Sequence, residues 1–354
     1  MKLYNCKHCW NALYFENSLC LKCQHNIGFD PMQMTMVTLV TENNVEFSDV
    51  TNNQAVYHYC ENASHGTCNW LVQADQAPFC IACSLNRTIP KLSHDDNWDK
   101  WKRIEIAKHR LVYSLLRLQV PVSAKDEPED IEGLAFDFMS DTSKGKRIMT
   151  GHANGVITLN IEEANEAIRV QHKLDLGEKY RTLLGHMRHE VGHYYWDVLI
   201  KDSAYLEQYR QLFGDEREDY SEALNHYYEN GPVANWNDSY ISPYATSHSW
   251  EDWAETWAHY LHLMDTLETA HAFGIDIYPT QIGDNHELKA DIYKDPYTIK
   301  DFNQIMEMWL PLTFAVNSLN RSMGHIDFYP FVIAPAVLEK LQFIHNVCGA
   351  NRLN

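Results

Sequence analysis

The sequence predicts an α+β protein in which a small cysteine-rich module, residues 1–90, precedes a larger domain, residues 91–354. Eight of the nine cysteines lie before residue 84. Beyond residue 97, apolar residues recur at the three- and four-residue steps of helices, interrupted by short segments typical of strands. At about 150 residues per domain, a chain of 354 residues has room for two domains and a sizeable core.

The excess of acidic over basic residues limits the kinds of partner that the chain can bind. The chain carries 29 Lys and Arg against 48 Asp and Glu, a formal net charge of -19, so it is a poor candidate for binding the phosphate backbone of nucleic acids. It has no run of about 18 apolar residues, so we expect no membrane partner, and its first residues lack the apolar core of a signal peptide. We therefore expect a cytoplasmic protein whose cysteines bind metal rather than form disulfides.

The N-terminal cysteines form two groups of four that suit zinc. A CxxC turn aims two thiolates at one point, and Zn²⁺ takes four such ligands in a tetrahedron. The sequence thus predicts two structural zinc ions, which would fold a segment too small to have its own core. The groups are Cys6, Cys9, Cys20 and Cys23, and then Cys60, Cys68, Cys80 and Cys83.

The pairing of these cysteines stays open at the level of sequence. Ten residues separate the first two CxxC pairs, fewer than the roughly 15–20 of a usual zinc ribbon. The ligands could therefore be shared crosswise between the groups. The histidines that could substitute for a cysteine are His8, His25, His58 and His65.

The hydrophobic pattern of the chain first predicts one strand and one long helix. Residues 34–40 alternate like a strand. Residues 98–118 carry their apolar side chains on one helix face, and the helix is expected to end before Val120-Pro121 because a proline disfavours helical backbone in the preceding residue. We expect this helix to join the module to the larger domain.

The next predicted elements are short. Polar, turn-rich loops at residues 123–130 and 140–145 surround an apolar segment at 134–138. Residues 155–161 then form a strand pattern, followed by an acidic helix start at Glu162-Glu163. These segments supply the β part of the larger domain.

Residues 185–197 contain the motif that carries chemistry, the HExxH formed by His189, Glu190 and His193. On a helix, positions i and i+4 lie above one another, so both imidazoles can reach one Zn²⁺ while the Glu touches a water on the metal. Zinc lowers the pKa of that water and polarises a substrate carbonyl, and the carboxylate takes the proton and returns it to the leaving amine. The helical period continues upstream through residues 180–184, so the motif predicts a hydrolytic zinc site with Glu190 as the base.

The third zinc ligand must come from another segment. Trp196 and Leu199 stand where the HExxHxxGxxH class has its Gly and its last His. Residues 249–260 follow a helical period, and Glu251 and Glu255 are i and i+4 on one face of it. This segment is the best supplier of the missing ligand, and the alternative is a solvated acidic helix face.

The two glutamates are expected to play different roles. We assign Glu251 to the zinc and Glu255 to the far N–H of His189, because a carboxylate on that N–H fixes the tautomer and orientation of a ligating histidine. Asp197, one turn past His193, is a second candidate for orienting a histidine.

The second helical segment resembles that of gluzincin metallopeptidases, whose third ligand is a Glu with an acidic residue four positions on. Its similarity to the anthrax lethal-factor-like branch places the ligand on Glu251. The tyrosine by which that branch stabilises the transition state falls seven residues earlier, on Tyr244. The resemblance implies that this phenol donates to the developing oxyanion, and the alternative is a tyrosine packed near the cleft.

Over nearly its full length, the chain also resembles a bacterial family of zinc-binding metallopeptidases with an N-terminal zinc-ribbon-like domain. The resemblance is carried by residues 68–72, 85–90, 180–197, 215–220 and 250–262. It implies a zincin-like domain over residues 91–354 that hydrolyses peptide or protein substrates, with one catalytic and two structural zinc ions. We expect the motif helix and the glutamate helix under a small sheet, whose edge strand, residues 155–161, pairs with an extended peptide.

Two other classes of function remain open. In the first, the HExxH site is structural and the zinc module docks a protein partner, for which the acidic surface favours a basic protein over DNA. In the second, the chain is a zinc amidase that acts on a small substrate.

Several other side chains have a plain structural interpretation. We expect His186 to be packed rather than to bind zinc, since two His and a Glu already fill a catalytic site. Arg181 and Arg188 are expected to pair with the acidic surface rather than to anchor a substrate carboxylate, and residues 215–220 to form a solvated loop. The helical spacing of three tryptophans favours the core over a specificity pocket; they are Trp250, Trp253 and Trp257.

Overall fold

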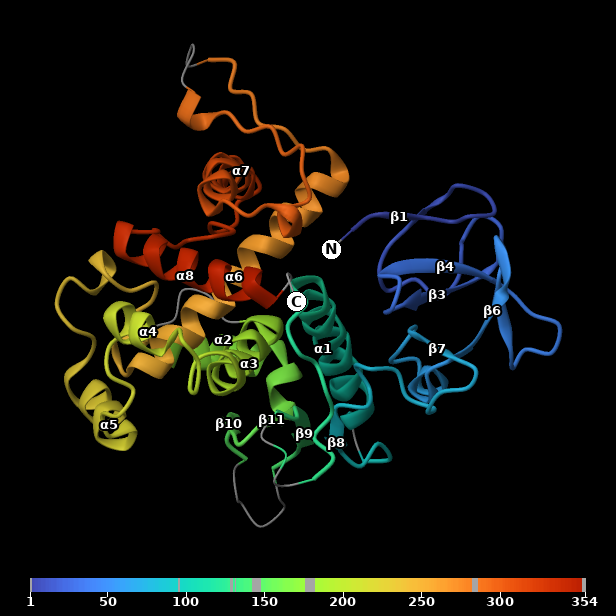
Figure 1. Ribbon diagram of the computed structural model, residues 1–354, viewed down its shortest axis with the longest axis horizontal. Coiled ribbons are helices and arrows are strands. Elements are labelled where there is room, and N and C mark those ends of the chain that lie inside the picture. The colour runs from blue at the N-terminus through green and yellow to red at the C-terminus, as the bar shows by residue number, and fades with distance from the viewer. Residues whose placement is uncertain are drawn as a thin grey trace. The chain divides into compact units, whose positions relative to one another are not determined.

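A computed structural model of the chain describes residues 2–94, 96–127, 130, 132–141, 148–175, 182–281 and 286–351 (Figure 1). The chain divides into two compact units. The first comprises residues 1–116, 121–151 and 155–169, and the second comprises residues 117–120, 152–154 and 170–354. The mixture of helices and sheets confirms the predicted α+β class. Most of the predicted loop at 140–145 and the residues 180–181 lie outside the described residues.

An antiparallel sheet of five strands dominates the cysteine-rich part of the first unit, in the order β3-β4-β5-β6-β7. These strands are Asn26–Asp30, Thr35–Val40, Phe47–Asp49, Asn52–Tyr59 and Leu71–Gln73. β4 confirms the strand predicted at residues 34–40. A buried cluster lies on this sheet and consists of Val37, Leu39, Phe47, Tyr57 and Leu71. A short pair, β1 (Tyr4–Asn5) and β2 (Ala12–Leu13), precedes it.

Helix α1, Asn97–Leu118, confirms the helix predicted at residues 98–118. Its Tyr113 packs against the cysteine-rich segment, with ring centroids 5.1 Å from Phe15 and 5.9 Å from Phe29. Trp70 completes this aromatic group, 4.8 Å from Phe29. The cysteine-rich segment and α1 therefore share one core within the first unit.

The small sheet has the order β10-β11-β9-β8, so β11 (Val156–Asn160) is an inner strand. The prediction that residues 155–161 form the edge strand is therefore wrong; β10 (Gly151–Ala153) lies outside it. Asn154 and Gly155 link these two strands and have φ of 49° and 76°. A two-residue Asn-Gly link with positive φ at both positions makes a tight hairpin, which adds the extra strand. The other strands are β8 (Asn86–Thr88) and β9 (Ala135–Met139).

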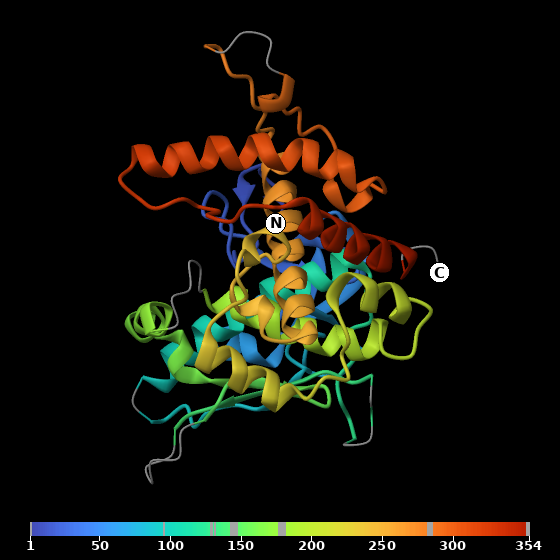
Figure 2. The same cartoon turned by 90° about the vertical axis from the view of Figure 1, so that its left-hand side faces the viewer.

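The second unit is helical and is built around α6, Ser249–Phe273, which contacts α3, α4, α7 and α8. Figure 2 shows α7 crossing near one end of α6. Trp253 and Trp257 are fully buried on α6, which confirms the core interpretation for these two residues. The remaining α-helices are α2 (Glu166–Asp175), α3 (Leu183–Leu199), α4 (Leu206–Phe213), α5 (Tyr220–Asn230), α7 (Phe302–Ser322) and α8 (Pro335–Asn351).

Six short 3₁₀ turns connect these elements in the described residues. They are η1 (Glu61–His65), η2 (Ile161–Ala164), η3 (Trp236–Asp238), η4 (Tyr244–Thr246), η5 (His286–Leu288) and η6 (Pro296–Thr298). Among the described helices, none combines the length and the apolar character that crossing a membrane requires.

Candidate metal centre

Helix α3 carries the HExxH motif, as the sequence predicts. The helix begins after Thr182, whose Oγ1 accepts a hydrogen bond of 2.9 Å from the N–H of Gly185. His189 and Glu190 are buried and His193 is partly buried. Since the two histidines are four residues apart, they project from the same face of α3.

Helices α3 and α6 approach closely because residue 192 is a glycine. A Cβ at Gly192 would lie 2.9 Å from Cα of Ala254 and 3.3 Å from Cβ of Trp257. The indole N–H of Trp253 donates to the carbonyl oxygen of Gly192 at 2.8 Å. These contacts fix the two helices in one register, with Glu251 beside the histidines.

The side chain of Glu251 lies against both histidines. The Nε2 atoms of His189 and His193 are 3.2 Å apart. Glu251 is almost fully buried and places Oε2 3.0 Å from Nε2 of His189 and Oε1 3.5 Å from Nε2 of His193. One ligand atom from each residue lies within 4.8 Å of the other two. The fold thus brings together the three side chains that the sequence predicts as zinc ligands.

Glu255 makes the contact expected of an orienting carboxylate. Nδ1 of His189 donates to Oε1 of Glu255 at 2.7 Å. The hydroxyl of Ser242 donates to the other oxygen of Glu255 at 2.6 Å. A carboxylate on Nδ1 holds the ring proton there and leaves the lone pair on Nε2, which faces Glu251 and His193.

This donor set fits a zinc ion. With the proton on Nδ1, the lone pair of His189 faces a carboxylate, and among the described residues nothing donates a hydrogen bond to the buried Oε2 of Glu251. Two acceptors in contact repel each other unless a cation lies between them. Burial lowers the pKa of His189, but Glu251 and Glu255 raise it well above its usual value, so this position favours a cation on Nε2, which is a proton where no metal ion is bound. Two imidazoles and a carboxylate are established ligands of catalytic zinc.

Glu190 points to the side of α3 that His186 occupies, one turn earlier. Nε2 of His186 lies 3.2 Å from Oε1 of Glu190. Burial raises the pKa of Glu190, but His186 and the two histidines of the motif outweigh burial and lower it. Glu190 is therefore held as a carboxylate. His186 contacts this carboxylate and is outside the group formed by His189, His193 and Glu251.

Two tyrosines lie beside Glu251. The hydroxyl of Tyr220, the first residue of α5, donates to Oε1 of Glu251 at 2.7 Å. Tyr244, on η4, has its ring centroid 6.1 Å from that of His189. Burial and the negative charge of Glu251 raise the pKa of Tyr244, so its phenol stays protonated and able to donate.

The sequence did not identify Tyr220 and His152 as neighbours of the metal-binding residues. Tyr220 belongs to residues 215–220, which we expected to be a solvated loop. The same residues are one of the segments that carry the family resemblance, and this was the signal that could have identified Tyr220. His152, on β10, stacks on His193 with centroids 6.3 Å apart and planes within 10°. Burial and the charge of His193 lower the pKa of His152 to about 4, so it is neutral at pH 7. We find no signal in the sequence that singles out His152.

Two other predicted side chains have different partners. Asp197 lies 3.7 Å from Nζ of Lys201, and the carboxylate found on His189 is that of Glu255. Arg188 is buried and pairs with Asp265 of α6. Arg188 therefore pairs with an acidic group, as expected, but in the interior rather than at the acidic surface.

The eight N-terminal cysteines gather in sequential groups rather than crosswise. In each group of four, one sulfur per residue lies within 4.8 Å of the others. In the first group Cys6 and Cys23 are 3.6 Å apart, and in the second Cys68 and Cys80 are 3.8 Å apart. These two clusters support zinc binding.

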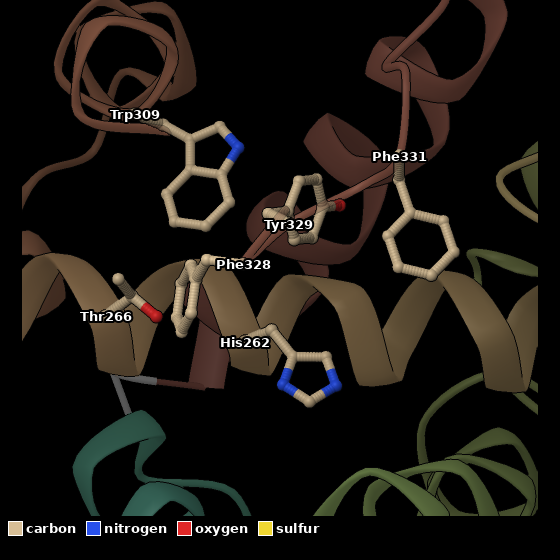
Figure 3. Close-up of a pocket in the computed structure, with 6 residues that line it drawn as sticks. All are labelled: His262, Thr266, Trp309, Phe328, Tyr329 and Phe331. Carbon is tan, nitrogen blue, oxygen red and sulfur yellow. The ribbon is translucent and has the colours of Figure 1, made fainter. Parts of the chain in front are cut away.

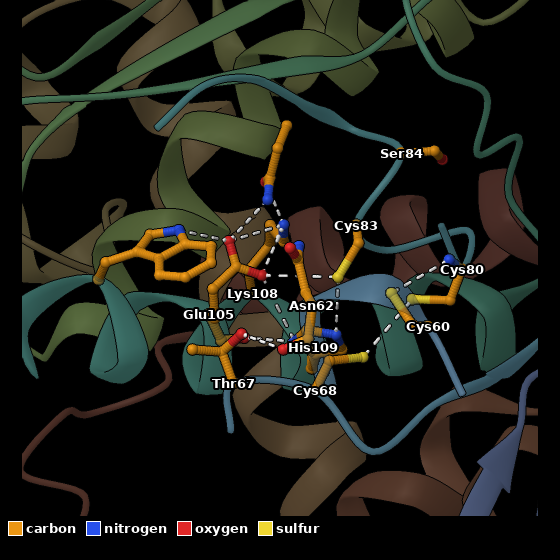
Figure 4. A network of polar contacts seen from close by, with 12 residues as sticks. Cys60, Asn62, Thr67, Cys68, Cys80, Cys83, Ser84, Glu105, Lys108 and His109 are labelled. Atoms are coloured by element: carbon orange, nitrogen blue, oxygen red, sulfur yellow. Dashed lines mark hydrogen bonds and ion pairs between the residues drawn. The ribbon is translucent and has the colours of Figure 1, made fainter. Parts of the chain in front are cut away.

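The second cysteine group is joined to α1 by a buried polar network (Figure 4). Sγ of Cys83 lies 3.6 Å from Nε2 of His109. The fully buried Lys108 contacts both oxygens of Glu105, at 3.0 and 2.9 Å, and also Asn86. Residues beyond position 90 therefore contribute to the surroundings of this cluster.

A small apolar pocket lies farther along α6 (Figure 3). It is lined by His262, Thr266, Trp309, Phe328, Tyr329 and Phe331. His262 is eleven residues beyond Glu251, about 16 Å along a helix at 1.5 Å per residue. The pocket is therefore separate from the metal centre.

Comparison with known proteins agrees with this geometry. Residues 97–347 match the family described as "Putative zinc-binding metallo-peptidase", and residues 3–94 match a zinc-ribbon domain. Uncharacterized proteins of Mycobacterium bovis and of two strains of Mycobacterium tuberculosis are each 41% identical over 349 residues, covering 98% of this chain and 95% of theirs. No solved structure matches the chain. The chain belongs to the zinc-binding metallopeptidase family and carries an N-terminal zinc ribbon.

Proposed function

We propose that the chain hydrolyses peptide bonds in a peptide or protein substrate and depends on zinc for this activity. The observation that carries the proposal is the convergence of His189, His193 and Glu251 within 4.8 Å, with Glu255 fixing the tautomer of His189. These three residues would hold the catalytic zinc. When bound, zinc would lower the pKa of a water and polarise the scissile carbonyl.

Glu190 would act as the general base and then as the general acid. Its lowered pKa keeps it unprotonated, so it can take the proton of the attacking water and deliver it to the leaving amine. The phenol of Tyr244, beside His189, would donate a hydrogen bond to the oxyanion that forms on the scissile carbonyl. Glu255 would hold the ring of His189 in place.

The two cysteine groups would each hold a structural zinc, giving three zinc ions per chain. We assign residues 1–90 to the zinc-ribbon-like module and residues 91–354 to the peptidase domain, and we expect the protein in the cytoplasm, where thiolates stay reduced. The acidic chain, with a net charge of -19, favours a basic protein as any partner that docks on the module.

The Glu190→Gln variant tests the proposal. It should keep its zinc, measured by native mass spectrometry, and cleave a peptide library about 10²- to 10⁴-fold more slowly than wild type, because it lacks a base. Glu229→Gln, an exposed residue of α5, is the matched control and should leave cleavage unchanged. Undiminished cleavage by Glu190→Gln would contradict the assignment of Glu190 as the general base. Hydrolysis of small amides without cleavage of any peptide would favour the amidase.

A further inference from the structure

Two histidines stand beside the first cysteine group. His8 lies inside the first CxxC turn, and His25 follows Cys23, the last residue of the second CxxC turn. Their rings stack with centroids 4.1 Å apart and planes within 26°. His8 is exposed, and His25 and Cys23 are partly buried. The histidines therefore pair at the surface, next to a predicted zinc site.

The backbone ties each histidine to a cysteine. His8 stands two residues after Cys6, and His25 stands two residues after Cys23. The carbonyl oxygen of His25 also accepts a hydrogen bond of 2.9 Å from the N–H of Cys20. The two rings are thus held by the same turns that gather the thiolates.

The side chains of His8, Cys23 and His25 form a metal-ligating group of their own. One ligand atom from each lies within 4.8 Å of the other two. Nδ1 of His25 is buried and has no hydrogen-bond partner among the described residues. A metal ion bound through this atom would supply the partner that it lacks.

We propose that His8, His25 and Cys23 bind one further divalent transition-metal ion, with the sulfur of Cys23 bridging it to the zinc of the first cysteine group. Imidazole and thiolate select zinc and its neighbours over magnesium and calcium. Four thiolates around one Zn²⁺ leave two formal negative charges, which a second divalent ion neutralises. Neutral imidazoles complete its ligands without adding charge.

The second cysteine group provides a contrast within the same chain. Cys83, Glu105 and His109 also bring ligand atoms within 4.8 Å of one another. There, however, Nζ of Lys108 lies 2.9 Å from Oε2 of Glu105 and occupies the carboxylate that a metal ion would need (Figure 4). We therefore expect the extra ion at the first group alone.

Zinc titration of the full-length protein tests this site. Wild type, the His8→Ala/His25→Ala variant and a control, His226→Ala/His325→Ala, are each loaded with excess Zn²⁺ and their ions counted by native mass spectrometry. His226 and His325 are exposed in the second unit, so the control also removes two surface histidines. Wild type and control should each hold one ion more than the His8→Ala/His25→Ala variant. This difference does not depend on whether the catalytic zinc is present.

Two results would overturn the proposal. One is the same ion count in all three proteins. The other is a loss of thiolate-to-cobalt absorption in Co²⁺-loaded His8→Ala/His25→Ala, because the first cysteine group would then have lost its own ion and the histidines would serve that site itself. Co²⁺ substitution tests the bridge: binding of the last ion should increase the thiolate-to-cobalt charge-transfer absorption in wild type and leave it unchanged in the variant. An extra Co²⁺ in wild type without this increase would rule out Cys23 as a shared ligand.

Discussion

The phenol of Tyr220 donates a 2.7 Å hydrogen bond to Oε1 of Glu251. The contact joins the start of α5 to the start of α6 and engages the carboxylate that lies 3.0 Å from His189. A hydrogen bond to a metal-binding carboxylate fixes its orientation, and losing such a contact commonly weakens metal binding 10- to 100-fold. Tyr220 therefore holds the carboxylate of Glu251 in position, a role that the HExxH motif alone does not predict.

Tyr220→Phe should weaken zinc retention about 10-fold or more, because it removes this hydrogen bond and leaves the packing of the ring nearly unchanged. Competition with a chelator of known affinity measures the change. Tyr244→Phe is the matched control: it should retain zinc and lose turnover, since Tyr244 is assigned to the oxyanion. Equal zinc affinity in Tyr220→Phe and wild type would remove Tyr220 from the centre.

Gly192→Ala should destabilise the second unit by about 1–3 kcal/mol, because the added methyl group meets the backbone of Ala254 at 2.9 Å. It should also weaken zinc retention, since α3 and α6 must separate to accept it. Gly349→Ala on α8 is the control, because its Cβ meets nothing within 4 Å; it should be neutral or slightly stabilising. Urea denaturation compares the variants, and a neutral Gly192→Ala would contradict the close packing of the helices.

Acid should remove the stabilisation that Asp137 of β9 contributes. Burial raises the pKa of Asp137, but its hydrogen bonds to Arg87 and Thr88 outweigh burial and lower it below its usual value. A carboxylate with a lowered folded-state pKa stabilises the protein above its unfolded-state pKa, about 3.9, and loses this effect as the pH falls further. Arg87→Met should therefore cost about 1–2 kcal/mol at pH 7, and the difference from wild type should shrink below pH 4.

Urea denaturation at several pH values checks this dependence. Arg217→Met, which removes the exposed partner of the partly buried Asp215, is the control and should change stability little at any pH. A gap between Arg87→Met and wild type that widened as the pH fell would contradict the sign.

Features set by local spacing could be predicted from the sequence. His189 and His193 share a face because four residues make about one helical turn, and the same argument brought Glu251 and Glu255 into consideration. The CxxC turns likewise predict zinc ligands in both cysteine groups, although Cys60 and Cys68 lie outside any such turn. In each case, the chemistry depends on residues less than about twenty-five positions apart, or on one helix whose period is visible.

Features set by tertiary packing were out of reach. Tyr220 reaches Glu251 across 31 residues, and no periodicity links the two positions. Likewise, the buried Lys108 and His109 of α1 approach the second cysteine group only through the fold of the first unit. The strand β10 is a different case: Asn154-Gly155 is a local hairpin signal that sequence reasoning overlooked, and the edge of the small sheet was therefore assigned wrongly.

The number of zinc ions per chain tests the central claim most directly. Native mass spectrometry of zinc-loaded wild type, His193→Ala, Glu251→Ala and the control His226→Ala should give one ion fewer in both site variants than in wild type and control. That result would mean that the motif and the distant glutamate build one metal site. The same zinc count in all four proteins, after loading with zinc, would contradict the account.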